Sequence, residues 1–253
     1  MMGLENRLID LMLDLHTHTV VSGHAYSTLK ENIEAARAKG LKGFAVTDHG
    51  PAMPGVLGDA YHVVNMKLAV PKVMEDIRII RGFEANIIDY DGKTDLPTEF
   101  SPSVEFIIAS LHEICIVPSS REENTAGVIN AMASGYVDAI GHPDGFKFPL
   151  DYLAITEAAY EYGIALEVNN NSLKGEVRGD TRNNYLELLR LAKKNRVYVA
   201  AGSDSHFYVS IGELDMARDI LEEVDYPKEL IINSSVERFD EFIRLRGNER
   251  KIL

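Results

Sequence analysis

The stretch Asp14-Leu15-His16-Thr17-His18 closes an apolar run that also contains Leu11 and Leu13. Side chains alternate along a β-strand, so His16 and His18 are expected on the same face. Two neighbouring imidazoles form a metal-chelating arrangement, although an isolated His-x-His pair is a weak motif. The stretch therefore predicts a strand with two candidate metal ligands at its C-terminal end.

Short apolar runs rich in β-branched residues recur along the chain, and amphipathic stretches separate them. Strands that alternate with helices are typical of parallel βαβ units. Seven such strands favour a closed barrel over an open sheet, and 253 residues suffice for one core. We therefore predict one α/β domain over residues 1–253. The predicted strands are 11–15, 43–46, 77–83, 105–109, 137–140, 164–168 and 197–201; the predicted helices are 28–40, opened by the Thr28–Glu31 capping box, 62–75, 122–134, 151–162, 181–195, 212–223 and one after residue 234.

The longest irregular stretch spans about residues 50–62 and contains Pro51, Pro54, Gly55 and Gly58. Long ordered loops tend to carry function. We expect this segment to form a rim or lid over a site.

Composition limits the classes of partner. The net charge of −13 and a pI near 5.1 argue against nucleic acid and anionic membrane surfaces, which require basic patches. Cys115 is the single cysteine, so no intramolecular disulfide can form, as suits a reducing compartment. The sequence shows neither a signal peptide nor a run of membrane-spanning length, and we expect a soluble cytoplasmic protein. It identifies no oligomer interface.

Residues that ionise or bind metals follow each predicted strand. The C-terminal ends of strands in a parallel barrel face one mouth, where such folds assemble active sites. Every histidine except His62 lies at these positions, which favours one site over scattered core histidines. The groups are His16 and His18 with nearby His24, Asp48-His49, Glu84, His112-Glu113, His142-Pro143, Asn169-Asn170-Asn171 and Asp204-Ser205-His206.

Seven imidazoles with Glu84 and Asp204 exceed the needs of one ion, because a zinc site takes about four ligands. Nine ligands, one of them able to bridge, suit two or three metals. Three divalent ions carry +6 and the two carboxylates −2, which leaves about +4 by simple counting. An acidic protein could bind a phosphate dianion in this way.

The same residues resemble, in order and spacing, the PHP (polymerase and histidinol phosphatase) family. The likeness runs from about residue 11 to about 245, and further strings around His24, His62 and Glu167 look like its YcdX branch. The matching motifs are His16-x-His18, His24, Thr47-Asp48-His49-Gly50, Gly82-x-Glu84, His112, Gly141-His142-Pro143 and Gly202-Ser203-Asp204-Ser205-His206.

This resemblance implies a distorted (β/α)7 TIM-like barrel with a trinuclear metal centre. The ions are expected to be zinc, and manganese or iron fits the same ligand types. The implied sets are His16, His18, Glu84 and Asp204 for the first ion; His24, His49 and His206 for the second; and Glu84, as a bridge, with His112 and His142 for the third.

The resemblance also implies hydrolysis of phosphate monoesters by a metal-activated hydroxide, with a small phosphorylated substrate. Three alternatives remain open at this point: a histidinol-phosphate phosphatase, a phosphodiesterase or nuclease, and a metal-binding module without turnover. The missing basic track disfavours a nuclease.

Further residues are candidates for catalytic or substrate-binding roles. Glu84, Asp204 and Asp48 are the candidate catalytic residues, and Asp48 acts either as a general acid or by orienting an imidazole. Asn169 and Asn170 either contact substrate or satisfy loop backbone. The other candidate substrate contacts are His62, Arg178, Lys174 and Lys147.

Overall fold

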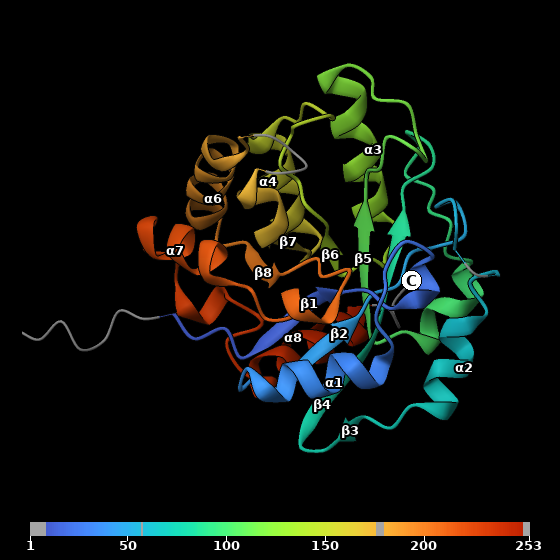
Figure 1. Ribbon diagram of the computed structural model, residues 1–253. Coiled ribbons are helices and arrows are strands. Elements are labelled where there is room, and N and C mark those ends of the chain that lie inside the picture. Colours follow the sequence, from blue (N-terminus) through green and yellow to red (C-terminus); the bar gives the residue numbers. More distant parts are fainter. Residues whose placement is uncertain (1–8, 57, 176–179, 250–253) are drawn as a thin grey trace, which may run out of the picture.

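The protein, here as a computed structural model that describes residues 9–56, 58–175 and 180–249, is built around one twisted sheet (Figure 1). Seven strands run parallel in the order β1-β2-β4-β5-β6-β7-β8, and β3 pairs antiparallel with β4. All seven predicted strands are present, and the α/β barrel fold is confirmed. The strands are β1 (Leu13–Thr17), β2 (Gly43–Val46), β3 (Val73–Met74), β4 (Ile77–Asn86), β5 (Phe106–Ser110), β6 (Ala139–Ile140), β7 (Ala165–Asn169) and β8 (Tyr198–Gly202).

Helices surround the sheet and cover one of its ends. The capping box that the sequence predicts is present, since the Thr28 and Glu31 side chains each bond the other's backbone N–H. Among the described residues, no helix is long and apolar enough to cross a membrane. The α-helices are α1 (Leu29–Ala38), α2 (His62–Ala69), α3 (Arg121–Ala133), α4 (Tyr152–Glu161), α5 (Asn170–Lys174), α6 (Arg182–Asn195), α7 (Asp215–Glu223) and α8 (Val236–Glu249); the 3₁₀ helices are η1 (Val20–Ser22), η2 (Thr98–Ser103), η3 (Tyr208–Ser210) and η4 (Lys228–Leu230).

Asn233 completes the barrel between β8 and β1. Its side-chain amide donates to the carbonyls of Leu13 (2.8 Å) and Ala201 (3.1 Å), and its Oδ1 accepts from the Ala201 N–H (3.1 Å). Ile232 N–H donates to the Val199 carbonyl at 2.9 Å. The residues after η4 thus lie between β8 and β1 in place of a further parallel strand. They form hydrogen bonds with backbone groups that these two strands leave unpaired.

At its C-terminal end, β1 meets the segment after β8 directly. His18 N–H donates to the Ser205 carbonyl and Asp204 N–H to the His16 carbonyl, each at 2.9 Å. Two segments that carry predicted ligands are therefore joined through their backbones.

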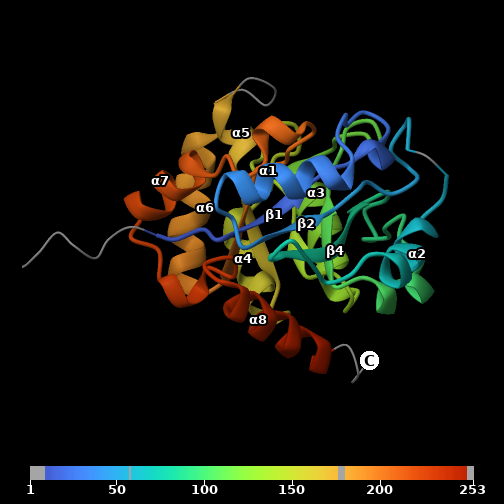
Figure 2. The ribbon, with the colours of Figure 1, turned by 60° about the horizontal axis from the view of Figure 1, so that its bottom comes forward.

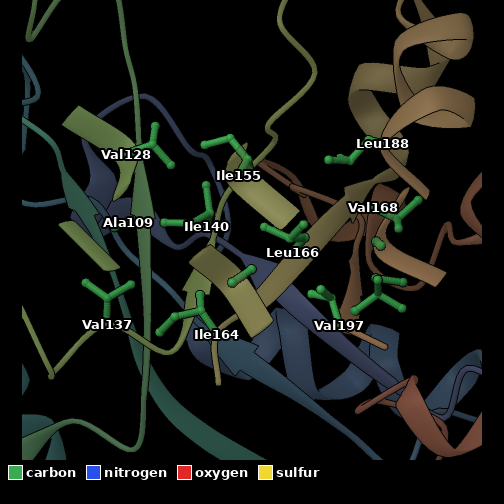
Figure 3. Close-up of a cluster of buried hydrophobic side chains, with 14 of the residues drawn as sticks. Ala109, Val128, Val137, Ile140, Ile155, Ile164, Leu166, Val168, Leu188 and Val197 are labelled. Carbon is green, nitrogen blue, oxygen red and sulfur yellow. The ribbon is translucent and has the colours of Figure 1, made fainter. Parts of the chain in front are cut away.

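The apolar core has an inner and an outer layer. Inside the barrel, Leu13, Ile80 and Phe106 pack together, and Phe239 and Phe242 of α8 join them from the N-terminal end of the strands. Figure 2 shows α8 at the end of the sheet opposite α5. The outer layer fills the space between the strands and helices α3, α4 and α6; Figure 3 draws part of it, including Val128, Ile140 and Leu188.

One local prediction was wrong, and one short helix was missed. The helix predicted over 62–75 ends at Ala69, and Val73–Met74 forms β3 instead. Pro71 explains the early end, because proline disfavours helix for the residue before it, and Val70 is extended with φ −100° and ψ 118°. Helix α5 was not predicted; the Asn169 side chain caps its start by accepting from Ser172 N–H.

Glu105 anchors an ion-pair cluster at the start of β5, at the same end of the barrel as α8. Its carboxylate accepts from Arg78 (2.6 Å) and Arg81 (2.9 Å), and Lys72 Nζ lies 3.3 Å away. Burial alone would raise the pKa of Glu105, but the two guanidinium groups outweigh it and lower the pKa from 4.5 to about 2.

Replacing Glu105 with Gln is expected to lower the free energy of unfolding near neutral pH and to have little effect near pH 2. The folded pKa lies below the unfolded one, so the stabilisation is present above about pH 4.5 and is lost as the pH falls toward 2. The shift corresponds to at most about 3 to 4 kcal/mol.

Urea denaturation of both chelator-treated proteins between pH 6 and pH 2.5 measures this difference. Glu157→Gln, on the exposed face of α4, is the control and should match the parent throughout. A Glu105→Gln deficit that stays constant with pH would contradict the assignment.

Candidate metal centre

All nine predicted metal ligands lie at the C-terminal mouth of the barrel. Glu84 belongs to β4 itself, because this strand continues past the predicted end at Phe83 to Asn86. The β1–β2 pairing shifts register between Asp14 and Thr17, so His16, directly after the inward-facing Leu15, also reaches the mouth. The other ligands follow strand ends, as the sequence predicts.

Glu84 lies at the centre of the cluster and is fully buried. Its Oε2 lies 3.2 Å from His16 Nε2, 3.5 Å from His18 Nε2 and 2.7 Å from His49 Nδ1. Its Oε1 faces a different pair, at 3.4 Å from His112 Nε2 and 3.2 Å from His142 Nε2. The two oxygens of one carboxylate thus face two separate groups of imidazoles.

Asp204 is the second carboxylate in the cluster. Its Oδ1 lies 3.2 Å from His18 Nε2, 3.7 Å from His16 Nε2 and 3.6 Å from His206 Nδ1. His24 approaches from the far side, with its ring centroid 4.8 Å from that of His206. Every predicted ligand therefore lies in one continuous cluster.

Hydrogen bonds fix the tautomer of His18 through Ser22 and Asp48. The Ser22 hydroxyl donates to Asp48 Oδ1 (2.6 Å), so toward His18 Nδ1, 3.0 Å away, it can only accept. His18 therefore carries its proton on Nδ1 and presents the Nε2 lone pair to the cluster. Asp48 also accepts from the N–H and hydroxyl of Thr19, each at 2.7 Å. This geometry favours the orienting role of Asp48 over that of a general acid.

A hydrogen bond at Nδ1 also orients the imidazoles of His16, His112 and His206. His16 Nδ1 donates to Glu167 (2.7 Å), and His206 Nδ1 donates to the backbone carbonyl of Asp204 (2.9 Å). His112 Nδ1 lies 2.7 Å from Asn86 Oδ1. Each bond engages Nδ1 and keeps Nε2 available as a metal ligand, which must be unprotonated to coordinate.

Asn86 is itself held by Asp95. Asn86 Nδ2 donates to Asp95 Oδ2 at 2.6 Å, which turns the amide oxygen toward His112. Asp95 also accepts the Ala52 N–H (2.9 Å) and so ties the irregular 50–62 segment to the cluster.

Backbone conformation supports this close packing. His142 and Asp204 adopt positive φ values of 28° and 54°, which non-glycine residues rarely do and which concentrate at functional sites. A Cβ on Gly202 would lie 2.4 Å from His16 Cβ and 2.5 Å from a Glu167 oxygen. Glycine is required there so that His16 and Glu167 can meet.

Electrostatics keeps the carboxylates ionised. Burial would raise the pKa of Glu84, but His49, His16 and His112 outweigh it and hold the pKa well below its usual range. The pKa of Asp204 is likewise lowered, since His16, His18 and His206 outweigh burial. Burial lowers the pKa of His112 to about 4, so this imidazole is neutral near pH 7.

Buried atoms without hydrogen bonds show that the cluster fits metal ions. His16 Nε2, His18 Nε2, His49 Nδ1 and Glu84 Oε2 are buried, point into the cluster and make no hydrogen bond. Such groups are costly unless they coordinate something. Imidazole nitrogens with carboxylate oxygens are the donor set of zinc and related divalent metals.

Within the part of the chain that the structure describes, three groups of ligand atoms are compact enough to hold an ion. They differ in part from the sets that the resemblance implies, because His18 and His49 each belong to two groups, while His24 and His142 belong to none. The groups are His16, His18 and Asp204; His18, His49 and His206; and His49, Glu84 and His112.

A cavity of about 470 Å³ opens over the cluster. His24, His49 and Asp204 line it, together with Lys174 and Asn171 from α5. Lys174 Nζ lies 2.5 Å from Glu213. Reacting groups can therefore reach the predicted ligands from solvent.

Three of the remaining predicted substrate contacts, Asn169, Asn170 and His62, form hydrogen bonds within the protein instead. Asn169 donates to Glu167 and Asp204, each at 3.3 Å, and so lies behind the ligands, whereas Asn170 caps α7 by accepting from Ala217 N–H (3.0 Å). His62 bonds the Asp59 carbonyl at 3.0 Å and does not line the cavity over the cluster. Arg178 lies outside the described residues.

Sequence reasoning missed the roles of Glu167, Asn86, Asp95 and Ser22. Glu167 could have been found, because a carboxylate inside the apolar run 164–168 signals a buried partner. For Asp95 and Ser22, no local pattern indicates the contact.

The PHP domain family profile matches residues 14–245. A protein named "Probable phosphatase" from Acetivibrio thermocellus is 46% identical over 239 residues, which cover 94% of this chain and 97% of that protein. Another of that name, from Caldicellulosiruptor saccharolyticus, is 44% identical over 94% of this chain and 98% of its own length.

Two solved structures share the fold. A putative histidinol phosphatase from Listeria monocytogenes superposes with a TM-score of 0.61 at 19% identity, covering 79% of this chain and 97% of its own. Histidinol phosphate phosphatase from Lactococcus lactis, solved with zinc, L-histidinol and phosphate, superposes with a TM-score of 0.59 at 19% identity. The match covers 86% of this chain and 95% of that one. With the family match over most of its length, this chain belongs to the PHP domain family.

Proposed function

We propose that this protein is a metal-dependent phosphatase that hydrolyses phosphate monoesters with three divalent ions, which we take to be zinc. The observation that carries the proposal is the buried Glu84 carboxylate, whose two oxygens face two groups of imidazoles. Relatives over 40% identical that are named probable phosphatases support the reaction class.

We assign Glu84 as a bridge between the site that includes His16, His18 and Asp204 and the site that includes His112 and His142. The distances from Oε1 and Oε2 to these imidazoles, 3.2 to 3.5 Å, support this role. For the other site we keep His24, His49 and His206, because their rings are neighbours, with centroids 5.0 Å apart for His24–His49 and 4.8 Å for His24–His206.

Bound divalent ions supply an activated water and offset negative charge on the phosphoryl group. The chain's own residues prepare the site for this chemistry. Glu167, Ser22 and Asn86 hold the imidazoles in one orientation, and Glu84 and Asp204 remain ionised. Asn171 and Lys174 line the mouth, where we place the phosphoryl oxygens.

A second candidate is hydrolysis of histidinol phosphate in particular. The fold shared with the Lactococcus lactis enzyme, whose structure contains zinc, L-histidinol and phosphate, favours including it. It falls within the same reaction class and is distinguished by substrate preference alone.

The protein reconstituted with zinc, and in parallel with manganese or iron, is expected to release inorganic phosphate from monoesters. A broad panel that includes histidinol phosphate and one phosphodiester, with phosphate release as readout, tests this. Chelator should abolish the activity and added metal restore it. Inactivity on every monoester with three ions bound would refute the proposal, and a preference for the diester would favour a phosphodiesterase.

Glu84→Ala is expected to lose more than one metal ion per chain, because the bridge supports two sites. Elemental analysis after gel filtration measures this directly. Glu105→Ala removes a largely buried carboxylate at the opposite end of the barrel and should leave the metal content of the parent. Loss of a single ion from Glu84→Ala would contradict the bridging role.

A further inference from the structure

A second cavity, of about 240 Å³, lies beside the metal centre. It opens between the loops that follow β5 and β6 and reaches helix α3. Two exposed apolar residues, Ile114 and Phe146, stand among its lining. Its buried walls are Leu111, Val128, Ile140, Phe148 and Leu150.

This cavity adjoins the candidate metal centre. His112 and His142, whose Nε2 atoms face Glu84, are also part of its wall. Met53 and His112 line both this cavity and the larger one above the cluster. A molecule whose reacting group lies on the cluster can therefore extend into the apolar cavity past His112.

The charged side chains in the lining have partners of their own. Lys147 Nζ lies 3.1 Å from Glu113 and 5.5 Å from the centroid of the Phe146 ring. Asp144 accepts from the Ser172 hydroxyl (2.8 Å) and from the Phe146 N–H (3.0 Å). The surface left for a ligand is mainly apolar, as in pockets that recognise shape and hydrophobic area.

We propose that this cavity binds the leaving group of the substrate and selects monoesters of alcohols that carry a compact apolar or aromatic group. The proposal rests on the phosphatase function above. A cavity of about 150 Å³ lined by apolar side chains is enough to hold benzene, so about 240 Å³ accepts one six-membered ring with a short linker. Burying such a ring favours its ester about 10- to 100-fold over a small alkyl ester.

The test compares benzyl phosphate with ethyl phosphate, two monoesters of primary alcohols. We expect kcat/KM to be at least about tenfold higher for benzyl phosphate. Equal values, or a preference for 2-aminoethyl phosphate or glycerol phosphate, would overturn the proposal.

Variants locate the preference in the cavity. Val128→Phe fills the cavity from its wall and should lower the benzyl-to-ethyl ratio of kcat/KM to near one. Ile114→Asp places a charge in the lining of the cavity and should also lower this ratio. Leu68→Asp makes the same exchange at an exposed leucine on α2 and should keep the ratio of the parent. If Val128→Phe fails to fold, Ile114→Asp still decides, because Ile114 is 62% exposed. An unchanged ratio in a folded variant contradicts the proposal.

Binding of phosphonates separates this inference from the phosphatase function. Calorimetry on the metal-loaded protein should show at least about tenfold tighter binding of benzylphosphonate than of ethylphosphonate. If that holds but no monoester is hydrolysed, the proposed reaction fails and the pocket stands. If monoesters are hydrolysed while the two phosphonates bind equally, the pocket assignment fails alone.

Discussion

A carboxylate buried at the mouth of a barrel is the constraint on which the rest of this structure depends. Glu84 is fully buried, and a buried charge persists only when it is paired. Five imidazoles meet its two oxygens, and several of their nitrogens have no other partner. Hydrogen-bond partners behind the ligands, such as Ser22 and Glu167, leave these imidazoles little freedom to turn away. The cluster is thus held in a state that divalent cations would stabilise.

The barrel makes this state possible because it fixes strand ends that are distant in sequence. Asn233 satisfies the backbone between β1 and β8, and direct hydrogen bonds join His16 and His18 to the segment after β8. At the other end, α8 fills the barrel interior and Glu105 holds two arginines. The α8 and Glu105 contacts that stabilise the fold and the candidate metal ligands therefore lie at opposite ends, as is usual in parallel barrels.

Much of this could be predicted from the sequence, because strand periodicity and ligand type are local signals. The seven strands, the capping box at Thr28 and the clustering of the histidines at one mouth follow from such signals. The end of α2 could have been predicted too, from Pro71. The contacts of Asp95 with Asn86 and Ala52 could not, since only the folded chain brings these residues together. Nor could spacing reveal that Asn170 caps α7 rather than facing the mouth.

The two cavities at the mouth of the barrel are lined by different kinds of residue. The larger one is lined by ligands whose positions depend on strand ends and hydrogen-bond networks, so it tolerates little change. The smaller one is lined mainly by the loops after β5 and β6. Side chains there such as Ile114 and Phe146 are exposed and contribute little to the packing of the core. Because His112 and Met53 border both, a change in these loops alters what fits beside the cluster while leaving Glu84 and its partners in place. If the proposed assignments hold, substrate choice in this barrel can vary separately from the candidate metal centre.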